Sequence, residues 1–111
     1  MFEKLQDRWI KNKKERVRNS EKRRKSVNGL IPVFKKYNIS LVYLFGSVAK
    51  NSCGSYSDID LYVEQADGKL YWKILRDLQA ASSYAIDLYT QADDIQFIRK
   101  IKQRGIKIYE S

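Results

Sequence analysis

The spacing of apolar residues separates a sparse N-terminal stretch from a denser remainder of the chain. Between residues 2 and 25 the few apolar side chains recur mostly at helical intervals, which predicts a helix with a narrow apolar stripe. The stripe consists of Phe2, Leu5, Trp9 and Ile10. Within this stretch, the run RNSEKRRKS at 18–26 has no apolar residue and predicts a solvated helix or a loop. A second helix is expected over 30–37, and Asn28-Gly29 is a typical break before it.

Beyond Asn38 the pattern alternates between short apolar runs and amphipathic stretches. Strands are predicted at 41–45, 57–63, 84–90 and 106–110. The stretch 68–81 predicts a helix whose inward side carries Leu70, Ile74, Leu75 and Leu78. A further helix follows a capping box of Thr90 and Asp93 and ends near Gln103, before Gly105. Its expected inward residues are Ile95, Ile98 and Ile101.

This order of elements predicts a small α/β (α+β) domain, with a mixed sheet of about four strands and helices packed on it. A length of 111 residues allows one domain with one modest core. We expect a basic helical extension over 1–27 and the folded domain over 28–111. No apolar run approaches the roughly 20 residues that a membrane span requires. We therefore expect a cytoplasmic protein without membrane contact.

The positive charge of the chain is concentrated near its N-terminus. Residues 1–36 hold 13 Lys and Arg against 4 Asp and Glu, whereas residues 37–111 hold 9 of each. Such a segment is typical of a solvated helix or of a surface that meets an acidic partner, and nucleic acid is one such partner. A nucleic-acid contact through residues 1–25 is therefore one open interpretation.

The chemistry available to the chain is limited by two features of its composition. The absence of histidine excludes His-based triads, His general bases and His-ligated zinc. Cys53 is the single cysteine, so no internal disulfide can form. Catalysis would therefore have to use carboxylates, hydroxyls, the thiol, or a hard cation held by oxygen.

Three aspartates in predicted strands supply such oxygen ligands. Strand side chains alternate, so Asp58 and Asp60 project from the same face while Ile59 turns into the core. Neighbouring carboxylates repel unless a cation lies against them, and Mg²⁺ often binds through one or two carboxylates plus substrate phosphates. Asp87 repeats the arrangement in the next strand. If the two strands are neighbours, the three acids converge on one patch. Three converging carboxylates are the ligands of a two-metal site that catalyses in-line displacement at phosphorus.

A Gly-Ser pair after the first strand could bind the phosphates of a nucleoside triphosphate. Gly46 lets the backbone approach a phosphate closely, and SVAK at 47–50 can begin a short helix whose N–H groups face the anion. Ser47 can add a hydroxyl donor, and Lys50 can add a positive charge or point to solvent. Each feature alone is a common turn or a polar strand face. The functional hypothesis depends on their conjunction.

The segment FGSVAKNSCGSYSDIDLYV, at 45–63, resembles the signature of the minimal nucleotidyltransferases (MNT) of the DNA polymerase β superfamily. The resemblance implies a polymerase-β-like nucleotidyltransferase fold over about residues 30–110. Gly46 and Ser47 match the phosphate-binding pair, Asp58 and Asp60 match the metal-binding pair in a Ser-Asp-x-Asp motif that begins at Ser57, and Asp87 matches the third carboxylate.

The resemblance also implies a reaction and a biological setting. Two Mg²⁺ ions would bind ATP or another nucleoside triphosphate, and AMP would be transferred to a hydroxyl acceptor. Small members of the family are commonly antitoxins that modify a tyrosine of a partner HEPN toxin. Lys50 and Ser57 are added to the expected nucleotide-binding residues. The family often has Arg-Ala-Arg-Gly after Gly-Ser, whereas this chain has VAKN at 48–51, which is expected to weaken or alter nucleotide binding.

Three alternatives remain open from the sequence. The acceptor could be a small molecule or an RNA end. The fold could serve a catalytically weak protein that only masks a partner, for which Val48 is the best support. The basic N-terminal segment could instead make the protein a nucleic-acid-binding module.

Overall fold

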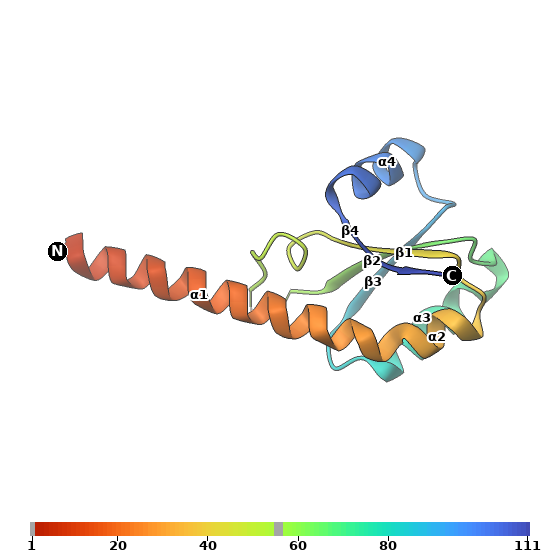
Figure 1. Cartoon of the computed structure of the whole chain (residues 1–111), viewed down its shortest axis with the longest axis horizontal. Coiled ribbons are helices and arrows are strands. Elements are labelled where there is room, and N and C mark those ends of the chain that lie inside the picture. Colours follow the sequence, from red (N-terminus) through yellow and green to blue (C-terminus); the bar gives the residue numbers. More distant parts are fainter. Residues whose placement is uncertain (1, 55–56) are drawn as a thin grey trace.

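The computed structural model describes residues 2–54 and 57–111, which form one sheet flanked by helices (Figure 1). Helix α1 (Phe2–Ser26) leads through a 3₁₀ turn (Val27–Leu30) into helix α2 (Ile31–Lys36). The strands are β1 (Leu41–Phe45), β2 (Ile59–Glu64), β3 (Ile86–Thr90) and β4 (Ile106–Glu110). Helix α3 (Tyr71–Ala81), preceded by a 3₁₀ turn (Gly68–Leu70), joins β2 to β3, and helix α4 (Ile95–Arg104) joins β3 to β4.

The sheet is mixed, with strand order β3-β2-β1-β4. Strand β1 pairs antiparallel with β2 and β4, whereas β2 and β3 are parallel. The expected four-stranded mixed sheet with helices is therefore confirmed. Because β2 and β3 run in the same direction, their N-terminal ends lie at the same end of the sheet, beside the C-terminal end of β1.

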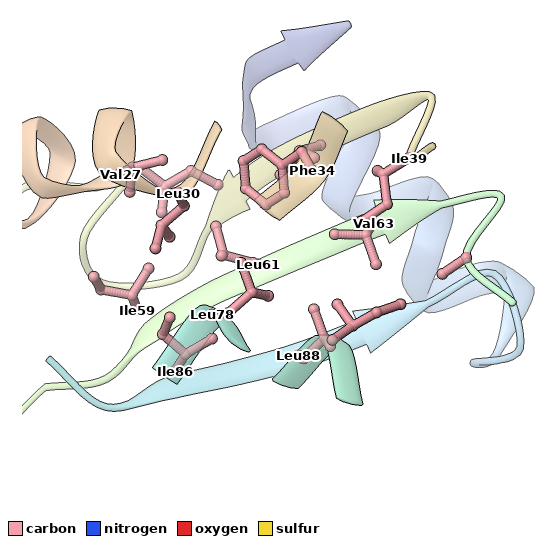
Figure 2. Packing of buried hydrophobic residues seen from close by; sticks show 14 of the residues in the cluster. Val27, Leu30, Phe34, Ile39, Ile59, Leu61, Val63, Leu78, Ile86 and Leu88 are labelled. Carbon is pink, nitrogen blue, oxygen red and sulfur yellow. The ribbon is translucent and has the colours of Figure 1, made fainter. Parts of the chain in front are cut away.

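One face of the sheet packs against the end of α1, α2 and α3 and holds the larger hydrophobic core. Figure 2 shows side chains from the helices (Val27, Leu30, Phe34, Leu78) converging on strand residues (Ile59, Leu61, Val63, Ile86, Leu88). Alternation along β2 sends Ile59, Leu61 and Val63 into this core, as the pattern predicts. These aliphatic contacts give the domain its main apolar core.

Helix α4 covers the opposite face and builds a smaller cluster (Figure 1). Tyr62, Ile98 and Ile101 are buried there, with Tyr43 and Phe45 packed against them. Tyr62 has no exposed surface, because α4 closes over the sheet at that position.

The start of α4 also differs from the expected capping. Asp94 is the N-cap, and its carboxylate accepts hydrogen bonds from the N–H groups of Gln96 and Phe97. Asp93 instead accepts from the N–H of Thr90 at 2.8 Å and closes the preceding turn. The helix phase set by Asp94 turns Ile95 outward, with 64% of its surface exposed, so the prediction that Ile95 faces the core was wrong.

Helix α1 continues through residues 18–26, so the open choice between helix and loop is resolved as helix. The break expected at Asn28-Gly29 is a 3₁₀ turn that keeps the chain helical into α2. The N-terminal half of α1 extends beyond the sheet (Figure 1) and gives the molecule a long axis of 56 Å. Across residues 2–54 and 57–111, no helix combines the length and the apolar character that crossing a membrane requires.

Candidate active site

Two of the three predicted acids are brought together by the parallel pairing of β2 and β3. Asp60 and Asp87 are direct register partners, so their side chains leave the same face of the sheet on adjacent strands. Asp58 lies in the irregular segment just before β2. Burial, together with the nearby charges of Asp87 and Asp58, raises the pKa of the Asp60 carboxyl to about 6. Asp60 therefore lies close enough to both other acids to interact with their charges.

The Gly-Ser turn lies directly against Asp60. Gly46 has a φ of +75°, a conformation that favours glycine. A Cβ atom at this position would lie 2.1 Å from Oδ2 of Asp60, so a side chain cannot be added without moving the carboxylate. Glycine is required here by the close approach of backbone and carboxylate. The turn and the acids are thus parts of one site.

The segment after Gly46 forms consecutive turns, so the short helix expected at 47–50 is wrong. The N–H of Lys50 donates to the Gly46 carbonyl at 3.2 Å, and the N–H of Ser52 donates to the Ser47 carbonyl at 2.9 Å. Asn51 has a φ of +58°, a left-handed conformation that asparagine tolerates better than most residues. Residues 46–51 therefore offer no helix N-terminus to an anion, and the exposed side chain of Lys50 is a separate source of positive charge.

The C-terminal half of α1 contacts the described parts of the connector, residues 46–54 and 57–58. The Arg24 guanidinium donates to the Val48 carbonyl at 2.9 Å and also contacts the Asn51 side chain. Arg23 Nε donates to the Ser57 carbonyl at 3.1 Å, and Ser20 Oγ donates to Cys53 Sγ at 3.1 Å. These contacts bring the basic helix to the segment that leads from Gly46 to Asp58.

Sequence reasoning missed this role, because basic residues in a helix usually indicate a solvated face. Arg23 is only 4% exposed, and its guanidinium stacks on the Tyr84 ring at 4.3 Å. Ser20 and Cys53 are both fully buried. The small Ser20 among charged residues was the one local signal of close packing in this part of α1.

Val48 and Ser57 have structural roles in the same connector. Val48 is fully buried in the main core, so it cannot replace the arginine of related sequences as a phosphate ligand. Ser57 Oγ accepts a hydrogen bond from the Gly54 N–H at 2.8 Å and closes the connector just before Asp58.

The acids fit a hard divalent cation that brings further ligands with it. All three side chains offer carboxylate oxygens, the donors that Mg²⁺ prefers, and burial together with the neighbouring acids raises the pKa of Asp60, which a bound cation would offset. Within the described parts of the chain, no group of three His, Cys, Asp or Glu side chains is already arranged as a metal site.

An aromatic cluster borders the acids on the same face of the sheet. The rings of Phe45 and Tyr89 lie 5.3 Å apart, and the Phe97 ring of α4 lies 5.7 Å from Phe45 and 5.4 Å from Tyr89. Burial and the charges of Asp87 and Asp60 raise the pKa of the Tyr89 hydroxyl, which indicates that this group lies near both acids. Phe97 and Tyr89 were not predicted as site residues, since only the packing of α4 brings them to the acids.

Comparison with known proteins agrees with this geometry. A model of the family described as Polymerase beta, Nucleotidyltransferase matches residues 28–111. A search among curated proteins finds no match. The fold resembles a chain of a toxin–antitoxin complex crystallised with AMP-PNP, with a TM-score of 0.64 at 22% identity, covering 76% of this chain and 73% of that chain.

Two further solved structures have the same fold. A chain of the complex between tri-AMPylated Shewanella oneidensis HEPN toxin and MNT antitoxin gives a TM-score of 0.57 at 22% identity, covering 80% of this chain and 73% of that one. A chain of the MntA–HepT toxin–antitoxin complex gives 0.58 at 20% identity, with coverage of 79% and 73%. At these identities the likeness establishes the fold alone. Because the family model spans most of the chain, the protein belongs to the polymerase β nucleotidyltransferase family.

Proposed function

We propose that this protein is a Mg²⁺-dependent nucleotidyltransferase that moves AMP from ATP to a hydroxyl acceptor, and that it acts as an antitoxin on a tyrosine of a partner HEPN toxin. The observation that carries the proposal is the register pair of Asp60 and Asp87, with the Asp60 carboxylate against the Gly46 backbone. Acids from two adjacent strands and a glycine turn in contact with them suit the binding of a metal-complexed triphosphate.

Asp58, Asp60 and Asp87 would hold Mg²⁺, two ions in the complete site. The bound metal would neutralise the triphosphate and the charge that develops on the leaving group. Gly46 gives the phosphates access to the backbone, and the side chains of Ser47, Lys50 and Ser57 are proposed to contact the nucleotide. Asp87, which is exposed at the start of β3, is suited to receive the proton of the incoming hydroxyl.

In the proposed reaction, the acceptor oxygen forms a bond to the α-phosphorus while the bond between that phosphorus and the bridging oxygen to the β-phosphate breaks. Pyrophosphate leaves with the electron pair of the broken bond. The protein forms no covalent intermediate, so its contribution is positioning and charge stabilisation.

The acceptor is inferred from the structural neighbours. One of them is a complex of an MNT antitoxin with a tri-AMPylated HEPN toxin, and another is a toxin–antitoxin complex with AMP-PNP. Both suit an antitoxin role with ATP as the donor. The fold alone is common to these proteins and this chain, so the acceptor requires direct measurement.

The test is to co-express the protein with a HEPN toxin and measure the intact mass of the toxin. We expect the toxin to gain the mass of one or more AMP groups, and to lose this gain with Asp58→Asn/Asp60→Asn. A matched control is Glu15→Gln/Glu21→Gln, which removes the same charge from exposed positions on α1. An unmodified toxin with the wild-type protein, under conditions in which Mg²⁺ and ATP are saturating, would contradict the proposal.

A second candidate is a masking partner without transfer activity. It is favoured by the projecting half of α1, where Trp9 is 65% and Ile10 is 45% exposed next to basic side chains. Toxin neutralisation that survives Asp58→Asn/Asp60→Asn, and is lost with Trp9→Ala, would favour masking over transfer.

A further inference from the structure

A pocket of about 180 Å³ lies beside the Gly-Ser turn, on the side toward β1 and α4. Its lining consists of Phe45, Gly46, Ala49, Lys50, Phe97, Lys100, Ile101 and Arg104. The four residues from α4 follow helical spacing, so a single side of the helix faces the pocket. Gly46 connects this pocket with the acids, because it lines the pocket and also touches Asp60.

The polar side chains of this pocket are all cationic. Lys50 comes from the connector, and Lys100 and Arg104 come from α4, while no acid is among the lining residues. Phe45, Ala49, Phe97 and Ile101 supply apolar walls, along which long basic side chains can lay their methylene groups. The pocket thus combines three positive charges with a lining that contains no carboxylate, and the nearby Asp60 lies beyond Gly46.

Several basic residues near the sheet are paired with acids, and the three cations of the pocket differ from them. Lys102, on the same helix, pairs with Glu64 at 2.6 Å, Lys107 pairs with Glu110 at 2.7 Å, and Lys36 pairs with Asp77 at 2.9 Å. Within residues 2–54 and 57–111, Lys50, Lys100 and Arg104 have no ion-pair partner. Arg104 also lies in the last turn of α4, where the helix dipole stabilises a positive charge. Lys50 lies outside any helix, so the helix dipole does not stabilise its charge.

We propose that Lys50, Lys100 and Arg104 bind the terminal β- and γ-phosphates of the nucleoside triphosphate in this pocket, and hold the pyrophosphate as it leaves. The proposal rests on the proposed function in taking a triphosphate as the ligand. The α-phosphate then lies at the acids, and the chain of phosphates passes the Gly46 backbone into the pocket. This arrangement assigns the binding of the phosphate tail largely to α4, since Val48 of the connector is buried.

The test measures binding of inorganic tripolyphosphate, ATP and AMP to the full chain by calorimetry, without Mg²⁺ for tripolyphosphate and with Mg²⁺ for the nucleotides. The variant is Lys100→Gln/Arg104→Gln. Its matched control is Lys73→Gln/Arg99→Gln, which removes two charges from exposed positions that do not line the pocket. We expect tripolyphosphate and ATP to bind about 10- to 100-fold more weakly to the variant than to the control, with AMP binding equal in both.

Lys100→Arg, which keeps the charge, should retain most of the affinity for tripolyphosphate. Equal loss of tripolyphosphate binding in the variant and the control would overturn the proposal, because general attraction to a basic protein would then explain it. Loss of AMP binding as large as the loss of ATP binding would also overturn it and would assign the pocket to the nucleobase. Thermal melting of each variant checks that the fold is intact.

Failure of this inference can be separated from failure of the proposed function. If AMP transfer proceeds with an unchanged KM for ATP in Lys100→Gln/Arg104→Gln, the inference is wrong and the transferase remains. If no acceptor is ever modified but tripolyphosphate binding depends on these two residues, the phosphate pocket remains and the proposed transfer does not.

Discussion

The two faces of the sheet are built from the same strands but bury different chemistry. The face toward α2 and α3 is closed by aliphatic residues and Phe34, all with little or no exposed surface. Among the described residues, the face toward α4 has a smaller buried cluster of Tyr62, Ile98 and Ile101, and Asp87, the register partner of Asp60, is exposed at one end of this face. The difference separates residues that stabilise the fold from residues that we propose bind a ligand at the expense of stability.

Strand β2 carries both roles in alternate positions. Ile59, Leu61 and Val63 pack into the closed core, while Asp60 and Tyr62 face α4. A shift in register by one residue would move the carboxylate into the aliphatic core, where an ion without a partner is very unfavourable. The closed face therefore fixes the register that positions the acids on the open face.

The largest expected effect is on stability and comes from the closed face. Phe34→Ala removes a ring with no exposed surface and should lower the free energy of unfolding by about 3–5 kcal/mol. The matched variant on the open face is Phe97→Ala, whose ring is 38% exposed and should contribute clearly less. Urea unfolding followed by circular dichroism measures both. Equal destabilisation by the two variants would contradict the distinction between the faces.

The next effect is on activity and comes from the open face. Asp60→Asn should lower AMP transfer by about 10²–10³-fold, a range typical of losing one electrostatic stabiliser of a transition state. The same change should leave the metal-free protein at least as stable as wild type above pH 6, because burial and neighbouring acids raise the pKa of this carboxyl to about 6. Steady-state kinetics and thermal melting test the two halves of this prediction. A variant that loses activity because it melts well below wild type would contradict it.

A smaller effect is expected where the connector meets the acids. Gly46→Ala requires a left-handed conformation for alanine, at about 1–2 kcal/mol, and adds a contact with the Asp60 carboxylate that must shift. Gly29 is the matched control, because a Cβ there meets nothing within 4 Å. Gly46→Ala should weaken ATP binding as well as stability, whereas Gly29→Ala should change neither by much. Unchanged ATP affinity in Gly46→Ala would separate the turn from the nucleotide site.

The local parts of this arrangement were predictable from the sequence. The alternation of residues in β2 correctly put Asp60 and Ile59 on opposite faces, and the strand order agrees with the expected pairing of the acid-bearing strands. Gly46 was expected to allow a close approach, and the close neighbour in the structure is the Asp60 carboxylate. These features depend on two-residue periodicity and on backbone conformation, which short segments determine.

Features that depend on long-range packing were not predictable. Arg23 lies in a run without apolar residues, and it is buried only because the Tyr84 ring and the Ser57 carbonyl lie against it. The outward rotation of Ile95 depends on which of two adjacent aspartates caps α4. The cationic pocket likewise requires Lys50 and Arg104, which are distant in sequence, to meet across the end of β1. No periodicity within a single segment carries that information.

The smallest effect concerns pH and sharpens the contrast between the open face and the rest of the molecule. Burial and the neighbouring acids raise the pKa of Asp60 from its ordinary value of 3.8 to about 6, so the folded protein holds this proton up to about pH 6. The stabilising contribution of that proton is therefore complete below about pH 4 and is lost as the pH rises through 6. Asp77 has the opposite behaviour, since hydrogen bonds from Tyr37 and Lys36 lower its pKa to about 2, so its contribution is lost only in stronger acid.

Binding of Mg²⁺ and ATP should have the reverse pH dependence to the stability contribution of Asp60. Because the proton must leave before a cation can bind, the affinity should fall about tenfold for each pH unit below 6. In Asp60→Asn this slope should disappear, while residual binding through the other groups remains weak at every pH. Calorimetric titration of the metal-free protein with MgATP between pH 5 and 8 measures both profiles. A ligand that binds the cation must compete with its own proton. If the affinity for MgATP still falls with pH in Asp60→Asn, the proton released on binding belongs to another group. Asp60 would then not be one of the metal ligands.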